Sequence, residues 1–219
     1  KMAHHATIFD WDDTLFPTSW WLDKANGIPE AAGVADLNLI LRALEILVRN
    51  LIEKAKSQGP VAIITNSKAQ WILESAKLHY PRSVQCFEGI NIISARDRYE
   101  ETTADSSLWK RLAFADYMAN ISSQGNNEKI GAILSVGDSL TERDALIDCG
   151  QLFNGLVIKS LKFVECPSID DVLHQLAGFI AVIDDVYDIS LNQDLAFSRD
   201  CQKISPYEPP AQPNDNPAS

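Results

Sequence analysis

Short apolar runs alternate along this chain with longer segments whose apolar residues recur at helical spacing. The clearest run is Val61–Thr65, a continuous β-branched stretch of the kind found in strands that are covered on both faces. Parallel strands need a crossover between them, and helices in the crossovers cover the sheet. We therefore predict an α/β fold of the doubly wound class, with a mainly parallel sheet and helices on both faces.

The predicted elements follow one another from the N-terminus to about residue 194. Strands are expected at residues 6–9, 61–65, 90–94, 130–136 and 158–163. Helices are expected at residues 36–56, through Trp71, Ile72 and Leu78 behind a cap at Asn66 or Ser67, from a cap at Ser106 or Ser107 to about residue 118, near residues 142–148, and after a capping box formed by Ser168 and Asp171.

The chain is expected to form one domain, with residues 1–194 as its core. Residues 15–33 carry Pro17, Gly27 and Pro29 and are predicted to be a loop that acts as a short flap. Residues 195–219 end in a segment rich in Pro, Asn and Ser, which buries too little apolar surface to offset its ordering entropy. We expect this end to be a disordered tail.

Charge and composition argue against two classes of partner. A formal net charge of -11 repels a phosphate backbone, so binding of nucleic acid through general electrostatics is not expected. No run approaches the length of a membrane helix, and the first residues lack the apolar stretch of a leader peptide. We expect a cytoplasmic protein without membrane contact. The four cysteines lack metal-site spacing and are expected to be reduced thiols.

Polar residues follow three of the predicted strands. Asp10 and Asp12 come after the first strand, Thr65 ends the second, and Asp138 follows the strand at residues 130–136. In parallel sheets ligands bind at the carboxyl ends of strands. Clustered aspartates repel one another unless a cation lies among their oxygens, and hard oxygen ligands suit Mg²⁺. The sequence therefore predicts a Mg²⁺ site at this edge.

These motifs resemble those of the haloacid dehalogenase superfamily of phosphohydrolases. The first family motif is a strand followed by D-x-D-x-T, which here runs from Asp10 to Thr14. The second is a strand ending in Ser or Thr, which matches Thr65, and the fourth is an acidic motif that matches "GDSLTERD" from Gly137. The resemblance covers about residues 6–164 and implies the superfamily's Rossmann-like fold.

The third family motif is a lysine near a helix start, and it has the weakest sequence signal. Lys110 lies in the first turns of the helix between the second and fourth motifs, and is chosen here. The other candidates are Lys68, Arg98 and Arg111.

The resemblance implies a role for each matched residue. Asp10 would attack phosphorus and become an aspartyl-phosphate, and Asp12 would serve as general acid and then general base. Asp10, Asp138 and the backbone carbonyl of Asp12 would hold Mg²⁺. The phosphoryl oxygens would be bound by Thr65, Asn66 and Lys110. Either Glu142 or Asp144 would support the metal site from behind.

The intervals between the motifs are too short for a large cap module, so we expect an open site with a minimal cap. Such a site would accept a phosphorylated small molecule or a phosphoprotein; the substrate itself and the oligomeric state are not predicted. Two alternatives stay open: a catalytically silent relative that binds phosphate or a partner, and a receiver-type signalling protein. The phosphorylated aspartate of a receiver follows a middle strand, whereas Asp10 follows the first.

Overall fold

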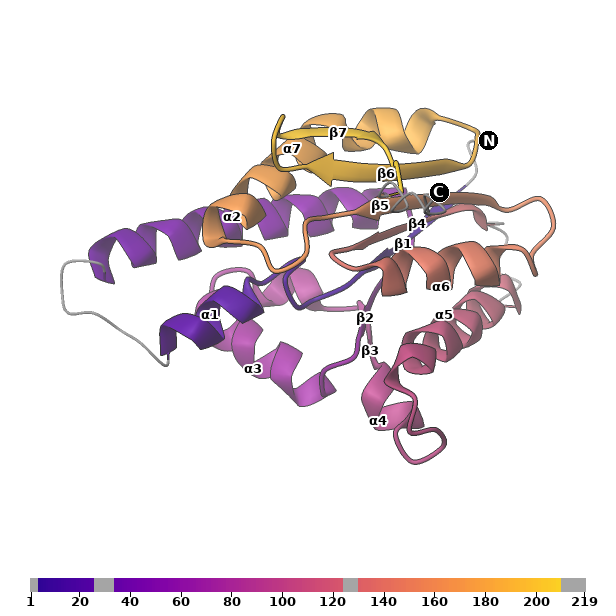
Figure 1. Ribbon diagram of the computed structural model, residues 1–219, viewed down its shortest axis with the longest axis horizontal. Coiled ribbons are helices and arrows are strands. Elements are labelled where there is room, and N and C mark those ends of the chain that lie inside the picture. Colours follow the sequence, from indigo (N-terminus) through magenta and orange to yellow (C-terminus); the bar gives the residue numbers. More distant parts are fainter. Residues whose placement is uncertain (1–3, 26–33, 124–129, 210–219) are drawn as a thin grey trace, which may run out of the picture.

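The computed structural model describes residues 4–25, 34–123 and 130–209. Seven strands in these residues form one sheet, in the order β3-β2-β1-β4-β5-β6-β7 (Figure 1). All neighbouring strands are parallel except β6 and β7. The strands span His4–Phe9 (β1), Val61–Thr65 (β2), Asn91–Ser94 (β3), Ile130–Gly137 (β4), Val157–Lys162 (β5), Gln193–Ser198 (β6) and Lys203–Pro206 (β7). The predicted mainly parallel α/β sheet is confirmed.

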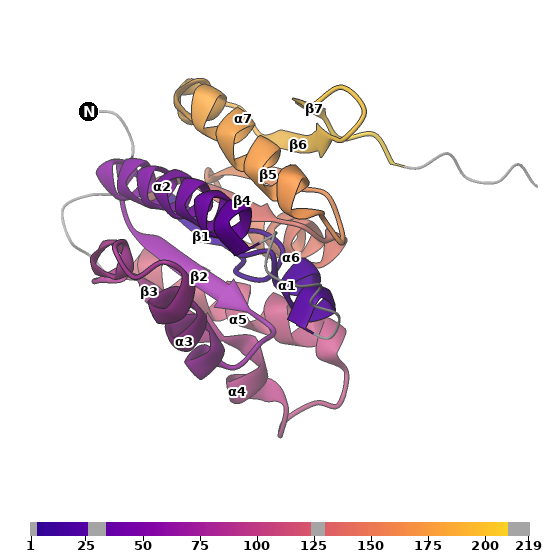
Figure 2. The ribbon, with the colours of Figure 1, turned by 90° about the vertical axis from the view of Figure 1, so that its left-hand side faces the viewer.

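Helices cover both faces of this sheet, as predicted. They span Thr18–Ala25 (α1), Val34–Gln58 (α2), Ala69–His79 (α3), Ala95–Tyr99 (α4), Ser106–Ser123 (α5), Leu140–Gly150 (α6) and Ile169–Asp188 (α7), with a 3-10 helix at Val84–Phe87 (η2). The helices α2 and α7 lie side by side on one face, and α5 and α6 lie side by side on the other (Figures 1 and 2). The fold is therefore Rossmann-like in its layers.

Each central strand contributes to two hydrophobic cores. Successive side chains of a strand point to opposite faces, so β1 places Phe9 in the core under α2 and α7 and Ile8 in the core under α5 and α6. Likewise, β2 divides Ile63 and Ile64 between the same two cores. This double burial explains why these strands are continuous apolar runs in the sequence.

The crossover from β5 to β6 through α7 has the opposite hand to the crossover from β4 to β5 through α6. From β4 to β5 and from β5 to β6 the chain moves in the same direction across the sheet, but α6 and α7 cover opposite faces. The two crossovers therefore have opposite hands, although most such crossovers are right-handed. As a result α7 packs against α2, and its Tyr187 hydroxyl lies 2.9 Å from the hydroxyl of Thr7 in β1.

Residues 15–33 were expected to be loop, and this prediction is wrong for their first part. Thr18–Ala25 forms α1, directly behind Pro17, whose fixed φ suits the start of a helix. Aromatic packing stabilises this helix, because the Trp21 ring lies 4.2 Å from the His79 ring, which in turn stacks on Phe16. Gly27 and Pro29 lie outside the described residues.

The prediction of a disordered tail from residue 195 is also wrong for the described part. There β6 adds to the free edge of β5, and β7 pairs with β6. Phe197 is buried against the core, and Arg143 binds Asp194 and lies over the ring of Tyr207, 4.2 Å from its centroid. Edge pairing and these contacts outweigh the polar composition. The Pro-rich end from residue 210 lies outside the described residues.

Two predicted helix caps are wrong and one is confirmed. The N-cap of α3 is Lys68, which makes no side-chain capping bond, and neither Asn66 nor Ser67 takes its place. Ahead of α5 the cap is made by Asp105, whose carboxylate accepts a hydrogen bond from the backbone N–H of Ser107. The capping box of Ser168 and Asp171 at the start of α7 is present as predicted.

Candidate active site

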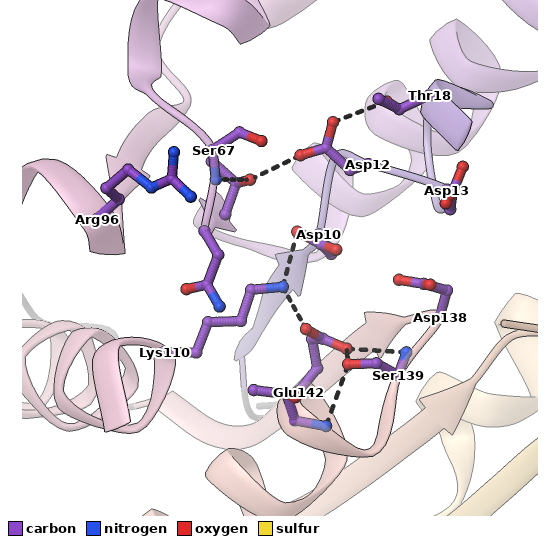
Figure 3. Close-up of a pocket in the computed structure, with 13 residues that line it drawn as sticks. Asp10, Asp12, Asp13, Thr18, Ser67, Arg96, Lys110, Asp138, Ser139 and Glu142 are labelled. Carbon is purple, nitrogen blue, oxygen red and sulfur yellow. Dashed lines mark hydrogen bonds and ion pairs between the residues drawn. The ribbon is translucent and has the colours of Figure 1, made fainter. Parts of the chain in front are cut away.

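The carboxyl ends of three adjacent strands meet at one edge of the sheet. Because β1 lies between β2 and β4, Asp10 behind β1 is flanked by Thr65 at the end of β2 and by Asp138 behind β4. A pocket of about 360 Å³ lies above these strand ends (Figure 3). The sequence prediction that the three motifs share one edge is confirmed.

A buried acid cluster forms one side of this pocket. Carboxylate oxygens of Asp10, Asp138 and Glu142 all lie within 4.8 Å of one another. The ammonium group of Lys110, from the first turns of α5, lies 2.9 Å from Oδ1 of Asp10 and also pairs with Glu142. Lys110 and Glu142 are each 3% exposed and Asp10 is 5% exposed. These three side chains are therefore largely withdrawn from water, whereas Asp138 is half-buried.

Burial and mutual repulsion shift the ionisation of this cluster. Burial raises the pKa of Asp10 well above its usual range, against the lowering effect of Lys110. Burial, with repulsion from Glu142, raises the pKa of Asp138 to about 7. In Glu142 burial is outweighed by Lys110 and by hydrogen bonds from Ser139, which lower its pKa. The neighbouring carboxylates outweigh burial at Lys110 and raise the pKa of its ammonium.

The charges and the donor atoms of this cluster fit a divalent cation. Three carboxylates face one ammonium, which leaves two negative charges without compensation when all three acids are ionised. Asp138 has no ion-pair partner among residues 4–25, 34–123 and 130–209. A set of carboxylate oxygens is the environment that Mg²⁺ prefers in proteins. The residues therefore fit the predicted ion, and the cluster could hold a metal.

The structure places Glu142, and not Asp144, at the site. Oε2 of Glu142 accepts hydrogen bonds from the backbone and hydroxyl of Ser139, which closes the capping box of α6, while Oε1 faces Lys110. A Cβ at Gly137 would lie 2.5 Å from Cγ of Glu142, so the glycine leaves room for this side chain. Asp144 is exposed and pairs with Arg143 instead.

The carboxylate of Asp12 is held beside the cluster by three donors. Oδ1 accepts from the hydroxyl of Thr18 at 2.7 Å and from Nε1 of Trp71 at 2.8 Å. Oδ2 accepts from the hydroxyl of Thr65 at 3.0 Å. The predicted phosphate donor Thr65 is thus engaged with Asp12 in this arrangement.

Lys110 reaches the site, and the alternative cations for its role do not. Arg111 pairs with Asp148 at the surface. Lys68 is exposed at the start of α3, and neither it nor Arg98 lines the pocket. Asn66 lines the pocket, and its Oδ1 is buried without a hydrogen-bond partner among the described atoms. The structure thus brings Asn66 to the pocket, and its predicted role as a phosphate donor stays a prediction.

Sequence reasoning missed several residues of the site, among them Thr18, Trp71 and Arg96. Trp71 was expected in a helix, but its contact with Asp12 joins residues 59 positions apart. Thr18 follows Pro17, a helix-start signal within the segment that was expected to be loop. Arg96 lines the pocket from α4, a short helix that no sequence pattern indicated.

The raised pKa values in the acid cluster lead us to expect that the stabilisation of the fold by Mg²⁺ depends on pH. Because the folded chain raises the pKa of Asp10 and Asp138, ionising them opposes folding, so their contribution to the stability of the metal-free protein falls as pH rises. Mg²⁺ binds the ionised forms. We expect Mg²⁺ to raise the melting temperature more at about pH 8 than at about pH 5.5. Equal shifts at both values, or an unchanged response in Asp138→Asn, would contradict this.

Comparisons of the chain with protein-family models, with curated proteins and with solved structures found no match. No helix among the described residues is long and apolar enough to cross a membrane. The structure itself thus provides a Rossmann-like α/β fold whose strand ends gather five acids, a buried lysine and a threonine around one pocket.

Proposed function

We propose that this chain is a Mg²⁺-dependent phosphatase of haloacid dehalogenase type, which hydrolyses the phosphate monoester of a small molecule or a phosphoprotein through an aspartyl-phosphate. One observation carries the proposal: Asp10, Asp138 and Glu142 come together at the carboxyl edge of the sheet, where Lys110 pairs with Asp10 and Glu142 and where Asp12 and Thr65 lie alongside. Two buried acids, Asp10 and Glu142, share the one ammonium of Lys110, and the half-buried Asp138 beside them adds a negative charge that is costly unless a cation offsets it.

The carboxylates of Asp10 and Asp138 and the backbone carbonyl of Asp12 would hold the proposed Mg²⁺, and Glu142 would support them. When bound, it supplies positive charge that offsets the repulsion between the carboxylate of Asp10 and a phosphate dianion. Lys110 adds a second, permanent positive charge on the same side, 2.9 Å from Asp10.

In the first half of the proposed reaction Asp10 is the nucleophile. Lys110 contacts Oδ1, so Oδ2 is the oxygen free to attack phosphorus. The new bond joins Oδ2 to phosphorus, the ester P–O bond breaks, and the leaving oxygen takes a proton from Asp12. Asp12 must first turn from Thr18 and Trp71 toward the leaving group.

In the second half Asp12 acts as a base. It takes a proton from a water molecule, which attacks phosphorus, and the acyl-phosphate bond breaks to release inorganic phosphate and restore the carboxylate of Asp10. The hydroxyl of Thr65 can donate or accept, so it can remain bound to Asp12 in either protonation state.

The proposal is tested by hydrolysis of a panel of phosphate monoesters, with Mg²⁺ and with a chelator. We expect turnover that the chelator abolishes and added Mg²⁺ restores. A matched pair of variants locates the supporting acid: Glu142→Gln should weaken the response to Mg²⁺ by about 10- to 100-fold, whereas Asp144→Asn should match the wild type. A larger loss in Asp144→Asn than in Glu142→Gln would contradict the assignment.

Two outcomes would overturn the function itself. Turnover that is indifferent to the chelator would contradict the role of the acid cluster. Absence of turnover across the panel, with Mg²⁺ shown to bind by its effect on the melting temperature, would favour the catalytically silent binding protein.

A further inference from the structure

We propose that Arg96 is a specificity residue that binds a second anionic group of the substrate, a carboxylate or another phosphate, apart from the phosphoryl group that is transferred. This inference rests on the proposed function of the same pocket. It predicts that the preferred substrates carry two anionic groups and not a single phosphate monoester on a neutral body.

The position of Arg96 separates it from the reacting group. Arg96 lies in α4, directly behind β3, and lines the same pocket as Asp10. Strand β3 is two strands from β1, a lateral separation of about 10 Å between the two backbones. Figure 3 shows Arg96 on the opposite side of the pocket from Asp138 and Glu142. The proposal therefore assigns to Arg96 an anionic group other than the phosphoryl group at Asp10.

An aromatic ring positions the guanidinium of Arg96. Its central carbon lies over the ring of Trp109, 5.6 Å from the centroid. The ring is fixed, because Trp109 is 8% exposed and its Nε1 donates to the backbone carbonyl of Thr103 at 2.9 Å. A cation-π contact uses the charge of a guanidinium and leaves N–H groups to donate to an oxyanion. Trp109 directly precedes Lys110 in α5, so the ring that contacts Arg96 and the second cation of the pocket come from the same helix turn.

The charge distribution leaves Arg96 free for a ligand. Lys110 is already paired with Asp10 and Glu142, whereas Arg96 has no ion pair with any residue that the structure describes. The remaining charged residues of the pocket are acids: Asp10, Asp12, Asp13, Asp138 and Glu142. Arg96 is exposed and lines the pocket, so its positive charge can offset part of the repulsion that the acids exert on a substrate anion.

The test compares three esters in wild type and variants: phenyl phosphate, 4-carboxyphenyl phosphate and 4-(aminomethyl)phenyl phosphate, all with Mg²⁺. We expect Arg96→Gln to lower kcat/KM for the carboxylated ester by about 10- to 100-fold through KM, the range of a charge-assisted hydrogen bond, and to leave phenyl phosphate nearly unchanged. Arg96→Glu should reverse the preference toward the aminomethyl ester. Arg98→Gln, on the same helix but outside the pocket, is the control and should match the wild type.

The outcomes separate this inference from the proposed function. If all esters are hydrolysed and Arg96→Gln lowers their kcat/KM equally, the inference is wrong and the function stands. If no ester is hydrolysed, the proposed function is wrong, and the inference is then tested by measuring the binding of the same esters by calorimetry. Tighter binding of the carboxylated ester that is lost in Arg96→Gln supports the inference. Equal binding of all three esters overturns it.

Discussion

Replacement of Asp10 by asparagine is expected to lower the turnover of phosphate monoesters at least about 10⁴-fold while the chain stays folded. The amide has the shape of the carboxylate but no anionic oxygen to attack phosphorus. Folding should be preserved, because Asp10 is 5% exposed and burial already disfavours its ionised form. Lys110 keeps its pairing with Glu142 when the charge of Asp10 is removed.

Two measurements check this expectation. Turnover is followed with Mg²⁺ in excess, and acid-quenched wild-type protein is searched by mass spectrometry for a phosphoryl group on Asp10, which Asp10→Asn should lack. Asp13→Asn is the matched control: Asp13 binds the backbone and hydroxyl of Ser19 at the start of α1, so its loss should cost about 1 kcal/mol of stability and less than tenfold in rate. Metal-dependent turnover that survives in Asp10→Asn would refute the nucleophile.

The central strands and their ends could be predicted from the sequence because both are local features. The apolar runs of the three strands contain only Thr7 and Ser135 as polar residues and no charged residue between Ala6 and Phe9, Val61 and Ile64, or Ile130 and Val136, so Asp10, Thr65 and Asp138 stand out at the strand ends. The order of the chain then places them at one edge, since consecutive parallel strands share a direction. Lys110 could be chosen because it lies in the first turns of the helix expected between the second and fourth motifs, which the structure has as α5.

The residues that the sequence did not indicate depend on contacts between distant elements. Thr18 and Trp71 both reach Asp12, but one comes from α1 and the other from α3, and neither has a local pattern that implies a polar role. Arg96 reaches the pocket only because α4 follows the strand at one end of the sheet. The strands β6 and β7 were missed because the composition of this part of the chain favours disorder. Their structure depends on the pairing of β6 with the free edge of β5.

Replacement of Lys110 by methionine is expected to damage both catalysis and stability. Methionine fills a similar volume but leaves Asp10 and Glu142 buried without their cation. Removal of one partner from a buried ion pair typically costs about 3–5 kcal/mol of stability. Loss of a positive group at the reacting phosphate typically costs about 10²- to 10³-fold in rate. We expect losses in these ranges, measured by denaturant unfolding without metal and by turnover with Mg²⁺.

The dependence of this stability loss on conditions identifies its cause. Without Lys110 the pKa of Asp10, already raised by burial, rises further, so ionising the acid opposes folding more strongly and the loss should be larger at about pH 8 than at about pH 5.5. Mg²⁺ should recover part of it at the higher pH, because a cation among the carboxylates replaces the missing charge. Arg111→Met removes the next cation along α5, which is half exposed and paired with Asp148 at the surface, and should cost less than about 1 kcal/mol at either pH. A loss in Lys110→Met that is equally small, or indifferent to both pH and Mg²⁺, would mean that the acids near Asp10 are not held together by charge.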